Sequence, residues 1–164
     1  MLPGVLTSGK QQQLQLQRER AAHHEAGHAL AAFARELPVV SASITTVRSG
    51  FFFTSWSVEG FVDAKDYDDT DDQLIAAAGI DAEALWTAAV CGGSFKSRRR
   101  AAVYDNPSDA GKVRDLVRLT ALTVDAAYAW SYDLLVEQWG AVEAMAAALL
   151  EDGFVSGRDL ARLL

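Results

Sequence analysis

A long run of helix-forming residues with a metal-binding motif near its centre constrains this chain more than any other feature. The run extends from Ser8 to Leu37 and is rich in Ala, Leu, Gln, Glu and Arg, all of which favour helix. Ser8 is a good N-cap residue, and Pro38 biases Leu37 away from helical angles. The sequence therefore predicts one helix that begins at Ser8 and ends before Pro38.

The motif is His-Glu-Ala-Gly-His at residues 24–28, of the form His-Glu-x-x-His. On a helix His24 and His28 lie one turn apart on the same face, so both imidazoles can reach one metal ion while Glu25 projects beside them. Neutral imidazole binds Zn²⁺ without cancelling its charge, and a carboxylate next to the metal, but not on it, can act as a general base. His24 and His28 are thus the predicted zinc ligands and Glu25 the predicted base. His23 is expected at the surface or beside the ligands.

A catalytic zinc site needs a third protein ligand, and all three histidines already lie in or next to the motif. Cys91 lies in a Cys-Gly-Gly turn, so a carboxylate is expected instead. Asp109 lies at the start of a predicted helix, where an acidic residue also stabilises the helix dipole. Glu83 lies on an apolar stripe of another predicted helix and requires a partner there, so it is either the ligand or a residue that orients a ligand histidine. The residues alone leave both candidates open.

Composition limits the class of protein. The 164 residues are 50% hydrophobic and 23% charged, which is enough apolar material for one globular domain over residues 1–164. The net charge of −7 argues against a nucleic-acid ligand, and the arginine cluster at 98–100 is expected to be a solvated loop. The single cysteine is typical of a reducing compartment, and residues 1–10 do not have the pattern of a signal peptide. The sequence contains no run of about 20 apolar residues and no phosphate-binding loop. We therefore expect a cytoplasmic protein that binds neither ATP, membrane nor nucleic acid.

A β-hairpin is predicted directly after the motif helix. β-Branched and aromatic residues over 39–47 and 51–58 indicate two strands, and residues 48–50 suit a turn between them. An acidic loop is expected over 59–72. The hairpin would lie beside the metal-binding helix.

The rest of the chain is predicted to be helical, so the expected fold class is mainly α with a small sheet. Leu and Ala at helical spacing indicate a helix from Asp72 to about Val90. Further helices are expected from Asn106, as a cap, toward Trp139, over 141–150, and after a turn at 153–157. Gly27 and Gly79 lie inside predicted helices, where we expect each to admit a closely packed neighbour.

Four stretches of the chain occur together in one known family. They are His-Glu-Ala-Gly-His-Ala at 24–29, a Gly-x-x-Ala-Glu helix motif at 79–83, Pro-Ser-Asp at 107–109 and the segment 148–160. The first stands unchanged, and the others are similar, in the peptidase domain of the FtsH-type, AAA-associated zinc metalloproteases. The resemblance spans most of the chain from about Gln17 onward.

The resemblance implies roles for individual residues. His24, His28 and Asp109 would be the zinc ligands, Glu25 the base, and Glu83 a residue that supports a ligand. The chain departs from the family pattern at two positions: the family has Asn where Ser108 stands, and a small or basic residue where Asp81 stands.

The resemblance also implies a function. From these residues we expect neither the family's ATPase module nor its membrane anchor, and hence a soluble, ATP-independent zinc endopeptidase that cleaves peptides or unfolded segments and is compatible with a homo-oligomer. In the family the hairpin offers an edge strand to the substrate, which implies substrate contacts here from Phe51, Phe52, Phe53, Thr54, Ser55 and Trp56. The alternative is a weakly active or non-catalytic interaction or regulatory module. A repressor-cleaving metallopeptidase is disfavoured because no helix-turn-helix segment or further histidine is present.

Overall fold

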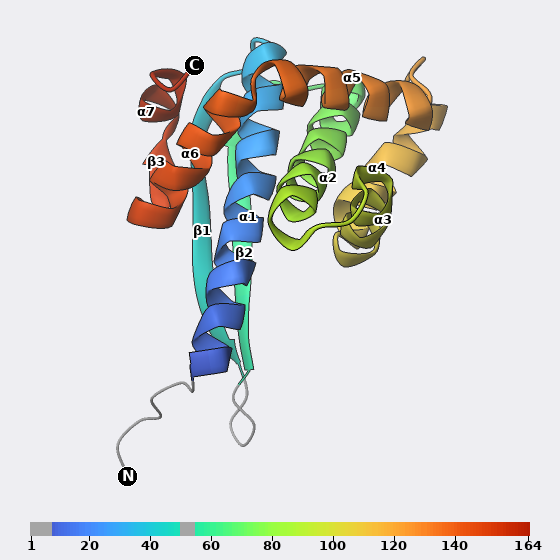
Figure 1. The fold of residues 1–164 in the computed structure, drawn as a ribbon. Coiled ribbons are helices and arrows are strands. Elements are labelled where there is room, and N and C mark those ends of the chain that lie inside the picture. Colours follow the sequence, from blue (N-terminus) through green and yellow to red (C-terminus); the bar gives the residue numbers. More distant parts are fainter. Residues whose placement is uncertain (1–7, 50–54) are drawn as a thin grey trace.

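The computed structural model describes residues 8–49 and 55–164. Within them the chain forms helices around a three-stranded antiparallel sheet (Figure 1). The helices are α1 Ser8–Ala34, α2 Asp69–Cys91, α3 Phe95–Asp105, α4 Pro107–Asp115, α5 Val124–Glu137, α6 Trp139–Asp152 and α7 Gly157–Ala161, with a 3-10 turn at Leu116–Arg118. The strands are β1 Val39–Ser49, β2 Ser55–Ala64 and β3 Phe154–Ser156, in the order β2-β1-β3. The prediction of a mainly helical fold with a small sheet beside the motif helix is confirmed.

Helix α1 packs against the sheet and against α2 (Figure 1). It spans the predicted run and ends before Pro38. Its end is closed by Glu36 in the left-handed conformation, with φ of 59°. The N–H groups of Glu36 and Leu37 donate to the carbonyls of Phe33, at 2.9 Å, and Ala32, at 3.0 Å, which resembles a Schellman cap. This cap turns the chain directly into β1, so the sheet folds back along α1.

Close packing of α1 on α2 depends on two glycines, as the sequence predicted. A Cβ on Gly27 would lie 2.5 Å from the carbonyl oxygen of Ala78 and 2.6 Å from the Cβ of Ala82. A Cβ on Gly79 would lie 2.6 Å from Nδ1 and 2.7 Å from Nε2 of His28. Neither approach leaves room for a side chain, so the two helices lie closer than larger residues would allow.

One face of the sheet is apolar and packs against α1. Ala42 and Ile44 of β1 are buried in the core cluster that also includes residues of α1 and α6. They pair with Val62 and Gly60 of β2, so these four residues share the face toward α1. Among the described residues the outer edge of β2 has no partner strand.

The strand β2 extends further than the sequence predicted. Residues 59–64, expected in a loop, continue β2, because they pair with the first half of β1 down to Val39 and Ala64. Arg48 and Ser49, expected in the turn, belong to β1. The rest of the predicted turn and the first residues of the predicted second strand, 50–54, lie outside the described residues.

Helix α2 starts a few residues before the predicted Asp72. Asp68 caps it, since its side chain accepts the backbone N–H of Asp71 at 2.9 Å while the side chain of Asp71 accepts the N–H of Asp68. In the part of the chain that the structure describes, α2 is the one helix whose length and composition would allow it to cross a membrane. Of its 18-residue apolar stretch, 61% is buried. Helices α1, α3, α4 and α5 cover it.

The arginine cluster forms helix α3, so the prediction of a solvated loop was wrong. The side chain of Ser94 caps the helix by accepting a backbone N–H of its first turn. The Arg98 guanidinium donates to the Gly92 carbonyl at the end of α2, at 2.8 Å. Arg99 pairs with Asp81, which is fully buried in α2. The cluster therefore fastens α3 to α2, which the charge pattern alone did not indicate.

The single helix predicted toward Trp139 is divided into α4 and α5, so that prediction was wrong. The buried side chain of Gln73 explains the break. Its Nε2 donates to the carbonyls of Val113, at 2.9 Å, and Leu122, at 3.3 Å, and its Oε1 accepts from the Thr120 hydroxyl at 2.7 Å. These bonds hold the segment between the helices in a turn that a continuous helix could not make.

The C-terminal part also differs from the prediction. Gly140 lies in the first turn of α6, and the break before it falls at Gln138, whose φ of −111° and ψ of 25° leave the helical region. Gly153 ends α6 in the left-handed conformation, as is common at helix C-termini. The predicted turn at 153–157 contains β3, which pairs with the second edge of β1.

Candidate metal centre

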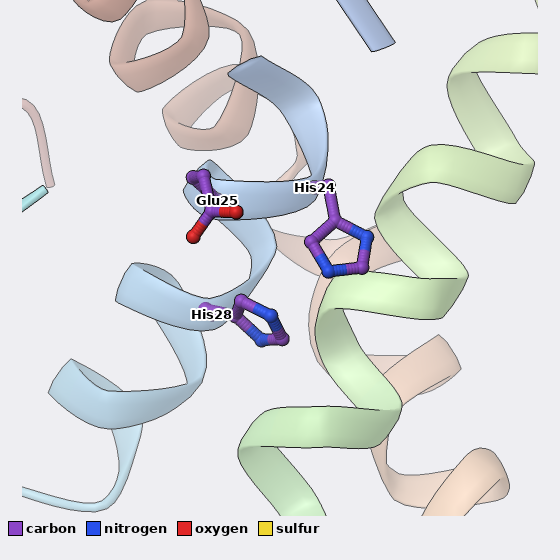
Figure 2. A group of neighbouring side chains, drawn as sticks. All are labelled: His24, Glu25 and His28. Carbon is purple, nitrogen blue, oxygen red and sulfur yellow. The ribbon is translucent and has the colours of Figure 1, made fainter. Parts of the chain in front are cut away.

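His24, Glu25 and His28 lie together on α1 (Figure 2). One ligand atom from each lies within 4.8 Å of the others, and all three residues are buried, so this group could hold a metal ion. The spacing of one helical turn brings the two rings edge to face, with centroids 4.5 Å apart.

Asp109, in the first turn of α4, reaches both histidines. Its Oδ2 lies 2.9 Å from Nε2 of His24 and 3.4 Å from Nε2 of His28. Ligand atoms at about 2.0–2.1 Å from a tetrahedral zinc ion lie about 3.3 Å from one another. The two separations from Asp109 are thus close to those that a shared ion requires.

The outer nitrogen of each ring has a partner that fixes the ring. Nδ1 of His28 lies 2.8 Å from the carbonyl oxygen of Ile75, and because a carbonyl only accepts, this nitrogen is the donor. Nδ1 of His24 lies 3.2 Å from Oε2 of Glu83. In the neutral rings the lone pair of each Nε2 therefore faces the Asp109 carboxylate. Three acceptor atoms that face one another need a proton or a metal ion between them, so the donor set fits zinc.

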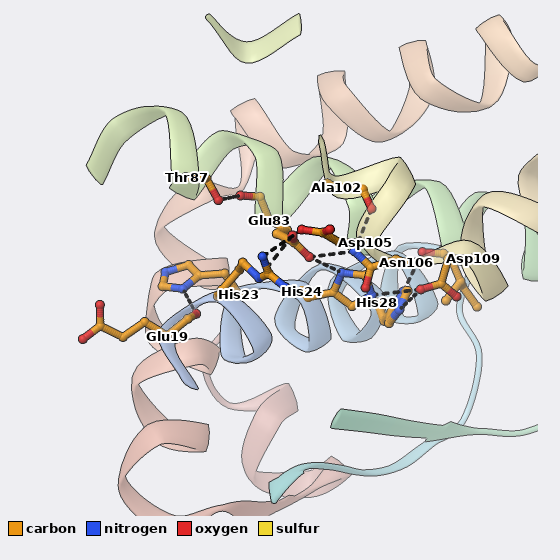
Figure 3. A network of polar contacts seen from close by, with 12 residues as sticks. Glu19, His23, His24, His28, Glu83, Thr87, Ala102, Asp105, Asn106 and Asp109 are labelled. Atoms are coloured by element: carbon orange, nitrogen blue, oxygen red, sulfur yellow. Dashed lines mark hydrogen bonds and ion pairs between the residues drawn. The ribbon is translucent and has the colours of Figure 1, made fainter. Parts of the chain in front are cut away.

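Glu83 contacts His24 at Nδ1, whereas Asp109 contacts the same ring at Nε2 (Figure 3). Its Oε2 accepts from the Asn106 amide at 2.9 Å, and its Oε1 lies 3.4 Å from Nε of Arg20. Arg20 also pairs with Asp105 at 2.9 Å. Glu83 is buried, so these donors supply the partners that the sequence required for it. The geometry separates the two carboxylate candidates, because only Asp109 approaches both Nε2 atoms.

The charges of the cluster shift three pKa values. Burial disfavours a charged His24 ring, but hydrogen bonds with Asp109 and Glu83 outweigh burial and raise the pKa of His24 to about 10. Burial also disfavours a charged Asp109, but its bonds with His24 and His28 prevail and lower the pKa of Asp109. Burial raises the pKa of Glu25, against the attraction of the two rings. A raised pKa suits a carboxyl group that accepts and returns a proton near neutral pH.

A cleft of about 920 Å³ opens beside the cluster. Its walls come from α1, β2, the connection 65–67, the first two thirds of α2, and α4 with Asn106 before it. Trp56 and Phe61 of β2 and Lys112 of α4 are among the lining residues, and Lys112 pairs with Asp72 at 2.9 Å. The cleft is large enough for a stretch of extended peptide.

Only two of the six predicted substrate residues, Ser55 and Trp56, lie within the described residues. Phe51, Phe52, Phe53 and Thr54 lie outside the described residues. Ser55 places its hydroxyl 2.7 Å from that of Ser49 across the hairpin. Trp56 lines the cleft and is 38% exposed, so a bound peptide could reach it.

His23 is neither at the surface nor beside the ligands, so its prediction was wrong. Its ring is buried and stacks on Trp86, with centroids 5.1 Å apart, and on Trp139, at 6.0 Å. Its Nδ1 bonds to the carbonyl of Glu19 at 2.7 Å. The next position along a helix points about 100° away, so His23 faces the two indoles while His24 faces the cluster.

Three residues of the site were missed by the sequence interpretation. Arg20 lies four residues before His24, so helical spacing already placed it on the same face. Asn106 was expected only as a helix cap, but its side chain makes no cap bond and donates to Glu83 instead. Gly60 was assigned to a loop, although a glycine within a strand often marks a close approach.

No protein-family model matches this chain, and a search of curated proteins finds no match. What the protein does is therefore inferred from its own residues.

Proposed function

We propose that this chain is a zinc metallopeptidase that resembles the FtsH-type peptidase domain and hydrolyses peptide bonds. His24, His28 and Asp109 would hold the zinc. The observation that carries the proposal is the meeting of two histidine Nε2 atoms with one carboxylate oxygen, while each Nδ1 is engaged elsewhere. Both Nε2 atoms meet the same carboxylate oxygen, which is the arrangement expected of ligands that share one ion.

Zinc, when bound, supplies a Lewis acid that polarises a carbonyl and acidifies water. The chain supplies the proton transfer. Glu25 lies beside both rings and lines the cleft, where its carboxylate can accept a proton and return it to the leaving nitrogen. Glu83 and the Ile75 carbonyl hold the two rings in the orientation that directs Nε2 inward.

The substrate in this proposal is an extended peptide or an unfolded segment. The outer edge of β2 has no partner strand among the described residues, and β2 lines the cleft. An extended chain can pair with such an edge through main-chain hydrogen bonds. Trp56 would add apolar contact, and residues 51–54 retain the substrate role expected from the sequence.

The test is a comparison of Glu25→Gln with His24→Ala. Purified proteins are loaded with zinc, assayed for metal content, and incubated with a mixed peptide library whose products are read by mass spectrometry. Glu25→Gln should retain zinc and lose cleavage, whereas His24→Ala should lose both. Glu151→Gln, at an exposed position on α6, is the matched control and should behave as wild type.

Two outcomes would reject parts of this proposal. Cleavage by Glu25→Gln at the wild-type rate would exclude Glu25 as the base. Zinc-loaded wild type that cleaves no peptide would favour the non-catalytic interaction module instead.

A further inference from the structure

Gly60 of β2 lies directly against the side chain of Glu25. A Cβ at this position would lie 2.5 Å from Cγ and 2.6 Å from Cδ of Glu25, and closer still to Oε1. Heavy atoms of a packed protein do not approach so closely, because dispersion contacts are optimal near 3.5–4.0 Å. Any side chain at this position would therefore displace the Glu25 carboxylate.

The backbone of Gly60 does not itself require glycine. Within the described residues the glycines with positive φ are Gly92, Gly93 and Gly153, so Gly60 has a conformation that other residues adopt. It pairs with Ile44 in a regular part of the β1–β2 ladder. A strand interior normally disfavours glycine relative to alanine. The contact with Glu25 is what distinguishes this position.

The side chain of Glu25 has fewer polar contacts to fix its position than the two histidines have. His24 and His28 are each fixed by a hydrogen bond at Nδ1. Over residues 8–49 and 55–164 the structure shows no hydrogen bond or ion pair to the Glu25 carboxylate. Its position is therefore set by packing between α1 and β2 and by the attraction of the two rings.

We propose that Gly60 is a positioning residue for the base: its missing side chain forms the slot in which the Glu25 carboxylate lies. The proposal rests on the proposed role of Glu25. A general base must lie within about 2.6–3.2 Å of the atom whose proton it takes, and a misplacement of about 1 Å can cost about 100-fold in rate. Strand β2 thus holds the base on one face and offers its edge to the peptide.

A double-mutant cycle tests this contact without any need for activity. Thermal unfolding is measured after EDTA treatment for wild type, Gly60→Ala, Glu25→Ala and the double variant. In wild type the added methyl overlaps Glu25, so Gly60→Ala should lower Tm. In the Glu25→Ala background the overlap is gone and alanine is the better strand residue, so the same change should leave Tm equal or higher. Equal Tm shifts in the two backgrounds would overturn the proposal.

The second readout separates the base from the metal. Gly60→Ala should keep a full equivalent of zinc, since it touches no ligand, while kcat falls by about tenfold or more with little change in KM. Wild-type kcat in Gly60→Ala would also overturn the proposal. Gly140→Ala is the matched control, because a Cβ there meets no atom within 4 Å. If wild type proves inactive, the peptidase proposal fails, but the Tm cycle still decides whether Gly60 positions Glu25.

Discussion

Replacing Asn106 with Ala removes the amide that holds the carboxylate behind His24. The Asn106 Nδ2 donates to Oε2 of Glu83 at 2.9 Å and to the carbonyl of Ala102 at 2.8 Å. Glu83 is only 4% exposed, so water cannot replace the amide easily. The carboxylate would keep Arg20 and His24 as partners and would be free to turn, and the His24 ring with it.

The size of the effect follows from these contacts. A hydrogen bond to a charged group contributes about 1.5–3 kcal/mol, so Asn106→Ala should lower the free energy of unfolding by about 2 kcal/mol. The N-cap of α4 loses no side-chain bond, because Asn106 makes none there, but the bond to the Ala102 carbonyl at the end of α3 is lost as well. Loss of a residue that orients a metal ligand typically weakens metal binding by about 10–100-fold. We expect zinc affinity to fall in that range.

Zinc affinity is measured by competition with a chromophoric chelator, and the free energy of unfolding by urea titration. Thr123→Ala is the matched control, since it removes the cap of α5, where the Thr123 side chain accepts the N–H of Ala126, and costs about 1 kcal/mol. It should destabilise the protein with no change in zinc affinity. Wild-type zinc affinity in Asn106→Ala, or an equal loss of affinity in Thr123→Ala, would show that Asn106 does not orient His24 through Glu83.

Three further outcomes are expected. Gly79→Ala should lose zinc and about 1–3 kcal/mol of stability, because its Cβ would overlap the His28 ring; metal analysis and urea unfolding check both. Arg99→Ala should lower the free energy of unfolding by about 3 kcal/mol, measured by urea titration, because it leaves Asp81 buried without its guanidinium partner. Arg99→Lys should not restore this stability, since Arg99 bonds both oxygens of Asp81. The folded-state pKa of His24 is raised from 6.5 to about 10. The charged ring therefore contributes fully to the free energy of unfolding below pH 6.5, and this contribution is lost as pH rises through 10. EDTA-treated protein should therefore lose stability over that range, and His24→Ala should show a weaker slope in urea titrations at stepped pH.

The elements that the sequence predicted well are those specified by local residues. Helix α1 follows from its composition, with Pro38 just after its end, and the contact between the His24 and His28 rings follows from their one-turn spacing. The start of α4 follows from Pro107, which suits the first position of a helix and so brought Asp109 to a helix N-terminus. Each of these signals lies within a few residues of the element that it specifies.

The parts that were wrong depend on residues far apart in the sequence. The turn between α4 and α5 is held by Gln73, which lies 40 positions before Val113 and donates a hydrogen bond to the Val113 carbonyl. Helix α3 is stabilised by Arg99 reaching back to Asp81. His23 is buried because one tryptophan from α2 and another from α6 enclose it. No local pattern encodes such partners, so charge and hydropathy indicated a loop, a longer helix and a surface histidine.

The three glycine contacts along α1 separate the parts of the site physically. Gly27 sets how near α1 lies to α2, Gly79 leaves room for the ring of His28, and Gly60 leaves room for the carboxylate of Glu25. The last two contact different side chains, His28 as the proposed ligand and Glu25 as the proposed base. Alanine at Gly79 should therefore remove zinc, whereas alanine at Gly60 should keep zinc and slow turnover. A metal that served only to hold the fold together would need the space at Gly79 for the His28 ring, but it would not need the space at Gly60 for the Glu25 carboxylate.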